Sequence, residues 1–99
     1  MILKIVNGKL ELRKDNGSLE KVIVERGVVD ADLNPENTLI VITLDNGRVD
    51  LRKTNGSLYN TVVPSKATRA RFNGKDIAIT LDSGKIDLRK ENGTLIRSL

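Results

Sequence analysis

Residues 46–62 of the chain read NGRVDLRKTNGSLYNTV, and the stretch has two close copies elsewhere. Residues 7–23 read NGKLELRKDNGSLEKVI, and residues 83–99 read SGKIDLRKENGTLIRSL. The Leu-Arg-Lys core begins at Leu12, Leu51 and Leu88, so the period is 39 and then 37 residues. Such a period is typical of architectures in which each repeat packs on its neighbours. The sequence therefore predicts one domain, 1–99, with repeats at 1–27, 28–64 and 65–99.

Asn-Gly dipeptides separate short apolar runs along the chain. They begin at Asn7, Asn16, Asn46, Asn55, Asn73 and Asn92, and Ser83-Gly84 takes the same place once. Because type I′ turns need a positive φ at both central residues, Asn-Gly predicts a tight hairpin. The runs between the turns are rich in Val, Ile, Leu and Thr, and they show no helical period. We therefore predict an all-β protein with type I′ turns.

The runs divide into three, four and four strands. The first repeat contains strands at 2–6, 9–14 and 18–24, and it lacks the first strand that the others have. The second contains 28–33, 38–44, 48–53 and 57–62, and the third contains 67–72, 76–81, 85–90 and 94–99. The run TLIVITL at 38–44 is apolar almost without alternation, which is typical of a strand buried on both faces.

The strand that contains the Leu-Arg-Lys core alternates between apolar and charged residues. Its charged face carries an acidic residue two positions before an arginine in every repeat, as Glu11 and Arg13, Asp50 and Arg52, and Asp87 and Arg89. These pairs form either a solvated polar face or a layer of carboxylate–arginine hydrogen bonds held between stacked sheets. Alternation alone leaves both interpretations open.

In the order of its strands and turns, the repeat resembles a short WD40-like β-propeller blade. The second repeat has VVDADL, NPEN, TLIVITL, DNG, RVDLRK, TNG and SLYNTV in the order that such a blade uses. The family's Trp-Asp dipeptide is replaced by Arg13-Lys14, Arg52-Lys53 and Arg89-Lys90, and its Gly-His pair is absent. The resemblance therefore implies the four-stranded blade without the hydrogen-bond network of the family proper.

A propeller of this kind needs more blades than this chain supplies. Propellers typically have four to eight blades, and closure covers the apolar faces of the end blades. We therefore expect an arc closed by oligomerisation, as a homodimer with six blades or, failing that, a homotrimer with nine. The alternative is a β-trefoil, which also has a threefold internal repeat but closes as a monomer.

The innermost strands of such blades would carry complementary charges. Asp30 and Asp32 of the second repeat align with Arg69 and Arg71 of the third. We interpret these residues either as partners between adjacent blades around a central channel or as ordinary exposed charges.

Composition argues against catalysis and against a metal or cofactor site. The chain has no His and no Cys, which removes the commonest general base and the commonest metal ligands. Tyr59 and Phe72 are its only aromatic residues, too few for a repeated sugar site or a platform for stacked bases. We therefore expect no enzyme activity and no cofactor.

The working hypothesis is a non-catalytic, self-assembling scaffold that binds another protein. The alternative is binding of a polyanion or nucleic acid by the third repeat, which has eight Lys and Arg residues against four Asp and Glu residues. No signal peptide or membrane segment is predicted, so we expect a cytoplasmic or virion-associated protein, of phage-like, other natural or designed origin.

Overall fold

The computed structural model describes all 99 residues, and the chain forms eleven β-strands in three separate antiparallel sheets. The first sheet has the order β1 (Ile2–Val6), β2 (Lys9–Arg13) and β3 (Leu19–Val24). The second has the order β4 (Val28–Leu33), β5 (Leu39–Leu44), β6 (Val49–Lys53) and β7 (Leu58–Val63). The third contains β8 (Ala67–Asn73), β9 (Asp76–Leu81), β10 (Ile86–Arg89) and β11 (Leu95–Ser98), again as neighbours in sequence order. The predicted all-β class is confirmed, and every strand lies within one residue of a predicted range.

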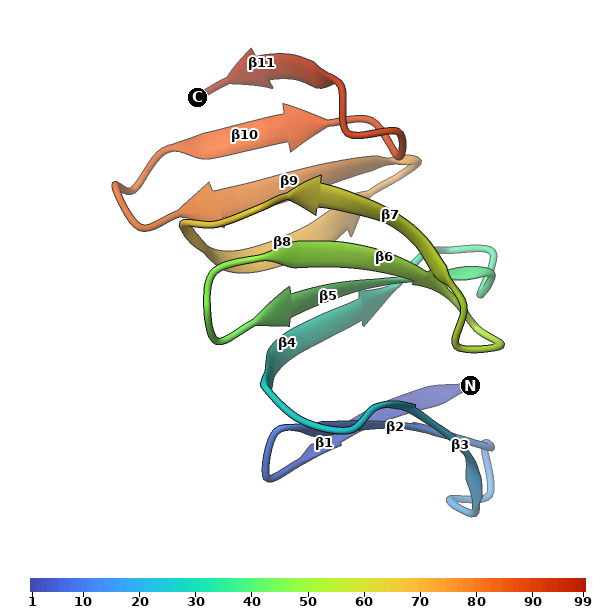
Figure 1. The fold of residues 1–99 in the computed structure, drawn as a ribbon. Helices are drawn as coiled ribbons and strands as arrows, with labels where there is room; N and C mark the ends of the chain where they lie inside the picture. The colour runs from blue at the N-terminus through green and yellow to red at the C-terminus, as the bar shows by residue number, and fades with distance from the viewer.

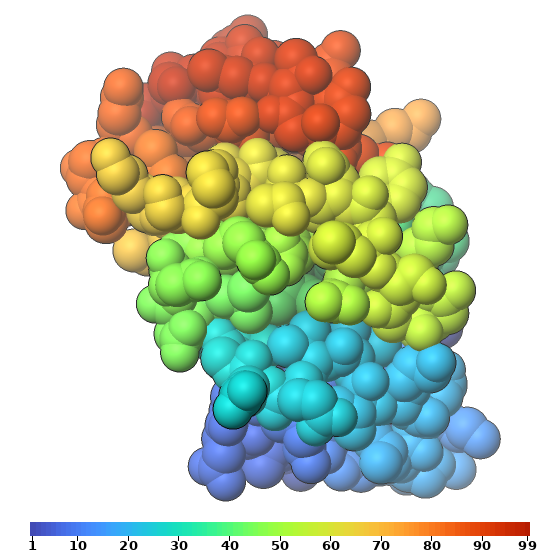
Figure 2. Space-filling model, viewed as in Figure 1, coloured from blue at the N-terminus to red at the C-terminus, as the bar shows by residue number.

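The sheets are stacked in chain order, with the first and third sheets at opposite ends of the molecule (Figure 1). The space-filling view shows the same order as successive bands of colour (Figure 2). No hydrogen-bonded ladder joins one sheet to another. A trefoil would close its strands into a shared barrel, so the trefoil alternative is wrong.

Most turns differ from the predicted type I′. Only Asn7-Gly8 has a positive φ at both residues, 50° and 79°. Five hairpins have three-residue loops in which the glycine N–H donates to the carbonyl three residues earlier, over 2.8 to 3.0 Å. This geometry is a type I turn followed by a left-handed glycine. These glycines are Gly17, Gly47, Gly56, Gly84 and Gly93.

The asparagine of these loops explains the difference. In the loop at Asn46, its side-chain Oδ1 accepts the backbone N–H of Arg48 over 2.9 Å. The same bond recurs from Ser18 to Asn16, from Ser57 to Asn55 and from Thr94 to Asn92. A short side chain that bonds the backbone two residues ahead stabilises the turn with asparagine itself at negative φ. Only the glycine then needs the left-handed region.

The apolar core lies between the sheets in two separate clusters. Between the first and second sheets, Leu10 and Leu12 pack with Ile40 and Ile42, all fully buried. Between the second and third, fully buried Val41, Val49 and Leu51 pack with Ile77 and Ile79 of the third. Strand β5 supplies both clusters, because its side chains alternate between two covered faces. The prediction that 38–44 is buried on both faces is confirmed for residues 39–43.

Each connection between sheets passes over an earlier turn of the sheet that it leaves, the β1–β2 turn at the first crossing and the β5–β6 turn at the second. Gly27 and Lys66 hold these crossings at a φ of 82° and 73°. At the first crossing the Val28 N–H donates to the Gly8 carbonyl over 2.9 Å, and at the second the Ala67 N–H donates to the Gly47 carbonyl over 3.0 Å. These contacts fix the stacking of consecutive sheets. The fold contains no helix, and hence none that could cross a membrane.

Candidate functional site

The polar repeat lies on the central strands β2, β6 and β10. Its three carboxylates are buried, with Glu11 5%, Asp50 2% and Asp87 8% exposed. Buried carboxylates need partners that satisfy their charge and lone pairs. Every side-chain partner of these carboxylates comes from the same sheet. Asp50 pairs directly with Ile42 and Asp87 with Ile79, and both isoleucines pack between sheets, so these two carboxylates lie on faces that a neighbouring sheet covers. The interpretation as a simply solvated face is therefore wrong for them, although their bonds run within a sheet and not from one sheet to the next.

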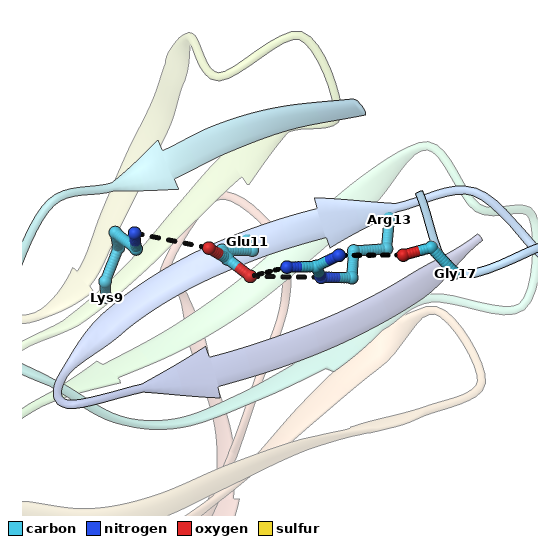
Figure 3. A network of polar contacts seen from close by, with 4 residues as sticks. All are labelled: Lys9, Glu11, Arg13 and Gly17. Carbon is cyan, nitrogen blue, oxygen red and sulfur yellow. Dashed lines mark hydrogen bonds and ion pairs between the residues drawn. The ribbon is translucent and has the colours of Figure 1, made fainter. Parts of the chain in front are cut away.

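In the first sheet, Glu11 lies between two cations (Figure 3). Its Oε1 accepts Nε and Nη2 of Arg13 over 3.0 and 2.7 Å, and its Oε2 lies 3.2 Å from Nζ of Lys9. The hydrogen bonds from Arg13, followed by those from Lys9, hold the pKa of Glu11 below its usual value against the opposing effect of desolvation. Glu11 therefore stays ionised although its side chain is covered.

The other two sheets vary the same arrangement. Asp50 accepts Nη2 of Arg48 over 2.9 Å and Oγ1 of Thr61 over 3.0 Å, so its ion pair is with the preceding arginine and not with Arg52. Asp87 accepts Oγ of Ser98 over 2.7 Å and lies 3.6 Å from Nη2 of Arg89. The predicted carboxylate–arginine spacing is thus a close hydrogen-bonded pair only in the first sheet.

The three arginines of the polar repeat share a contact that the sequence analysis missed. In each sheet, Nη1 donates over 2.7 Å to the carbonyl of the glycine four residues ahead, as Arg13 to Gly17, Arg52 to Gly56 and Arg89 to Gly93. The recurrent Arg-Lys-x-Asn-Gly spacing was the available signal. The contact ties the arginine to the hairpin loop that follows its own strand, so these arginines have a structural role.

The inner-strand charges meet between the second and third sheets. Nη1 of Arg71 lies 2.6 Å from Oδ2 of Asp30, and it also donates to the Ala31 carbonyl over 3.3 Å. Oδ2 of Asp32 accepts the backbone N–H of Phe72 over 2.9 Å. Three of the four predicted residues therefore lie at this junction. The fourth, Arg69, is exposed and makes no side-chain hydrogen bond or ion pair within the chain.

The surface offers no deep cavity and no obvious metal centre. Four shallow depressions have volumes of about 310 to 420 Å³, and Tyr59 borders two of them. No three His, Cys, Asp or Glu side chains lie close enough together to hold a metal ion.

Three antiparallel sheets stacked face to face, each strand paired with its neighbours in sequence, define a β-propeller-like fold. The structure is similar to the crystal structure of BamB from Moraxella catarrhalis, a β-propeller protein, with a TM-score of 0.78 over 98% of this chain. The two sequences are 14% identical, so the likeness shows the fold alone. The chain spans 31% of the length of that BamB chain.

No protein-family model matches the chain, and neither does any curated protein. The propeller-like part of the predicted resemblance is confirmed by the structural likeness to BamB. The WD40-like part stays a prediction.

Proposed function

We propose that this protein is a non-catalytic, self-assembling β-propeller-like scaffold that binds other proteins. The observation that carries the proposal is the outer face of the third sheet. Ile86 is 36% exposed and Leu88 is only half-buried, whereas Val49 and Leu51, which occupy the same places in the second sheet, are fully buried. Within the chain those places are covered by the sheet that follows. A further sheet of the same kind would cover Ile86 and Leu88.

A second copy of the chain is the occupant that the stacking geometry favours. The carbonyls of Gly8 and Gly47 accept an N–H from the start of the next sheet, and these contacts accompany each stacking step. Gly84 holds the same place in the third sheet with a φ of 90°, and no atom beyond its own and those of its two chain neighbours lies within 4 Å of where its Cβ would be. The end of the stack thus presents both the apolar face and the backbone acceptor that a following sheet uses.

Assembly of this kind closes most readily as a dimer. Two copies contribute six sheets, which lies within the usual range of four to eight, whereas three copies contribute nine. Closed symmetry is the common solution for soluble homo-oligomers, because an open head-to-tail contact would continue into filaments. We therefore propose a homodimer ahead of a homotrimer.

The test is the solution mass by size-exclusion chromatography with light scattering. The chain has a mass of 10.9 kDa, and we expect a species of two chains. Ile86→Glu places a charge on the proposed contact face and should yield monomers. Leu58→Glu is the matched control, because Leu58 is 54% exposed on the outer strand β7 of the middle sheet. A wild-type protein that stays monomeric at 100 μM would contradict self-assembly.

Polyanion binding is the second candidate, and exposed Arg69 favours it. Against it, Arg13, Arg52 and Arg89 each use Nη1 on a turn carbonyl of their own sheet. Binding to heparin or single-stranded DNA that weakens steeply with salt, and that Arg69→Gln reduces, would favour this candidate. Absence of such binding at 50 mM salt would exclude it.

A further inference from the structure

The inner edge of β1 lacks a partner that both other sheets possess. β5 pairs with β4 and β9 pairs with β8, whereas β1 is the edge strand of its sheet. Leu3 and Ile5 of β1 pair with β2 in the places where Val41 and Thr43 of β5 pair with β6, so the two pairs of residues are equivalent. Val41 and Thr43 are fully buried, but Leu3 is half-buried and Ile5 is 39% exposed. The first sheet therefore has an open position where the others carry an inner strand.

The free edge of β1 is suited to main-chain pairing. The two-residue turn Asn7-Gly8 closes the hairpin at the pair Val6 and Lys9. Residues of an antiparallel strand direct their backbone groups alternately to one neighbour and to the other. Because Val6 bonds Lys9, the N–H and C=O groups of Leu3 and Ile5 point to the open side. An extended polypeptide can add to such an edge as a further strand.

The junction between β4 and β8 shows which side chains suit consecutive inner strands. Asp30, the third residue of β4, pairs with Arg71, the fifth residue of β8. Asp32, the fifth residue of β4, accepts the N–H of Phe72, the sixth residue of β8. The third residue of one inner strand thus carries the charge opposite to the fifth residue of the next. The fifth residue of the first strand also accepts a hydrogen bond from the backbone N–H of the sixth residue of the next strand.

The same relationship defines the strand that would precede β4. Its third residue would meet the carboxylate of Asp32, whose Oδ1 makes no hydrogen bond within the chain, so a basic residue is complementary there. Its fifth residue would meet the backbone N–H of Leu33. Leu33 pairs with Ile40 in the place where Phe72 pairs with Ile77, so the N–H of Leu33 points toward the preceding sheet as that of Phe72 does. An acidic residue at the fifth place accepts that N–H.

We propose that the free edge of β1 binds an extended segment of a partner polypeptide with a basic third and an acidic fifth residue. The segment runs antiparallel to β1, as β4 runs to β5. The inference deepens the proposed function and rests on it, since it gives the chemistry of the protein partner.

The test compares two fluorescent peptides of identical composition, Val-Val-Arg-Ala-Asp-Leu and Val-Val-Asp-Ala-Arg-Leu, both flanked by Gly-Ser. Fluorescence anisotropy should show the first peptide binding at least tenfold more tightly than the second, and the preference should shrink in high salt. Equal affinity of the two peptides, or no binding of either at millimolar protein, would overturn the proposal.

Three variants locate the binding site. Asp32→Asn keeps an acceptor for Phe72 but loses the charge, and should reduce the preference about tenfold. Asp30 pairs with Arg71 at the junction between the second and third sheets, so Asp30→Asn should leave the preference between the two peptides unchanged. Ile5→Pro removes an N–H from the free edge, where proline is tolerated, and should abolish binding while the far-UV circular dichroism is retained. Loss of preference in Asp30→Asn but not in Asp32→Asn would contradict the assigned edge.

Failure of this inference is distinguishable from failure of self-assembly. The mass is measured on the same samples without peptide. A dimer that binds the two peptides equally supports the self-assembling scaffold and refutes the strand-binding site on β1. A monomer that prefers the first peptide refutes self-assembly and retains the strand site.

Discussion

Nη1 of Arg71 lies 2.6 Å from Oδ2 of Asp30, and this ion pair joins the inner strands of two sheets across 41 positions of sequence. The Arg71 side chain is 38% exposed and the Asp30 side chain 22%. Solvent therefore screens much of the attraction between the charges. The pair orients the second and third sheets, while the apolar cluster between them supplies most of the stability.

A double-mutant cycle with Asp30→Asn and Arg71→Gln measures the strength of this pair. We expect a coupling of about 0.5 kcal/mol at low salt, the usual value for a partly exposed ion pair, and less at 1 M salt. Urea unfolding of the four proteins gives the coupling. The control cycle pairs Asp30→Asn with Arg69→Gln. Because the Arg69 side chain makes no hydrogen bond or ion pair within the chain, this coupling should be nearly zero.

Gly47→Ala should be far more damaging than the same change in the equivalent turn of the third sheet. A Cβ on Gly47 would lie 2.5 Å from the backbone nitrogen of Lys66, at a φ of 86°. We expect a loss of about 3 kcal/mol, from left-handed strain together with displacement of the crossing segment. Gly84→Ala carries the strain without the clash and should cost about 1 kcal/mol to the isolated chain. Similar losses of unfolding free energy for both would contradict the close approach at Gly47.

Lys66→Gly should stabilise the protein. Lys66 holds a φ of 73° at the second crossing, a region that costs a side-chain-bearing residue energy, whereas Gly27 fills the equivalent place at the first crossing. We expect a gain of about 0.5 kcal/mol, since relief of strain exceeds the added flexibility of the unfolded chain. The reciprocal Gly27→Lys should lower the melting temperature. A melting temperature that falls in Lys66→Gly would count against the strain.

Acid should destabilise the first sheet through Glu11. Hydrogen bonds from Arg13 and Lys9 place its folded pKa below that of the unfolded chain. The stabilisation is therefore present above the unfolded pKa and is lost as the pH falls through the folded pKa. Glu11→Gln should flatten the loss of stability below about pH 4.5, near the ordinary carboxyl pKa. Unfolding midpoints between pH 3 and 7 measure the effect. Glu20→Gln, at an exposed position of β3, is the control substitution.

The strand pattern was predictable because it depends on neighbours along the chain. Asn-Gly punctuation and alternation place Val49 and Leu51 on one face of β6 and Asp50 on the other, and the structure keeps that division. The turn type was not predictable from the dipeptide alone. The bond from the Arg48 N–H to Asn46 makes a three-residue loop available, and this loop replaces the type I′ turn.

The candidate site was only partly predictable, because its contacts also depend on side-chain and backbone hydrogen bonds that the residue pattern does not specify. Alignment of the repeats placed Asp30 opposite the strand of Arg71, and the structure pairs them. The bond from Phe72 to Asp32 uses a backbone donor, which carries no signal in the residue type. Likewise, the identity of the Asp50 partner depends on side-chain reach, and the pattern alone predicted Arg52 where the structure has Arg48.

The sequence by itself determined the all-β class, the strand ranges and the apolar face of each strand, because these follow from backbone preferences and a two-residue period. Only the tertiary structure decided which faces are covered, since burial depends on the presence of a neighbouring sheet. Leu51 and Leu88 occupy the same place in nearly identical repeats, yet one is fully buried and the other is not. The difference arises because β8 and β9 stack on the second sheet, while the outer face of the third sheet remains uncovered.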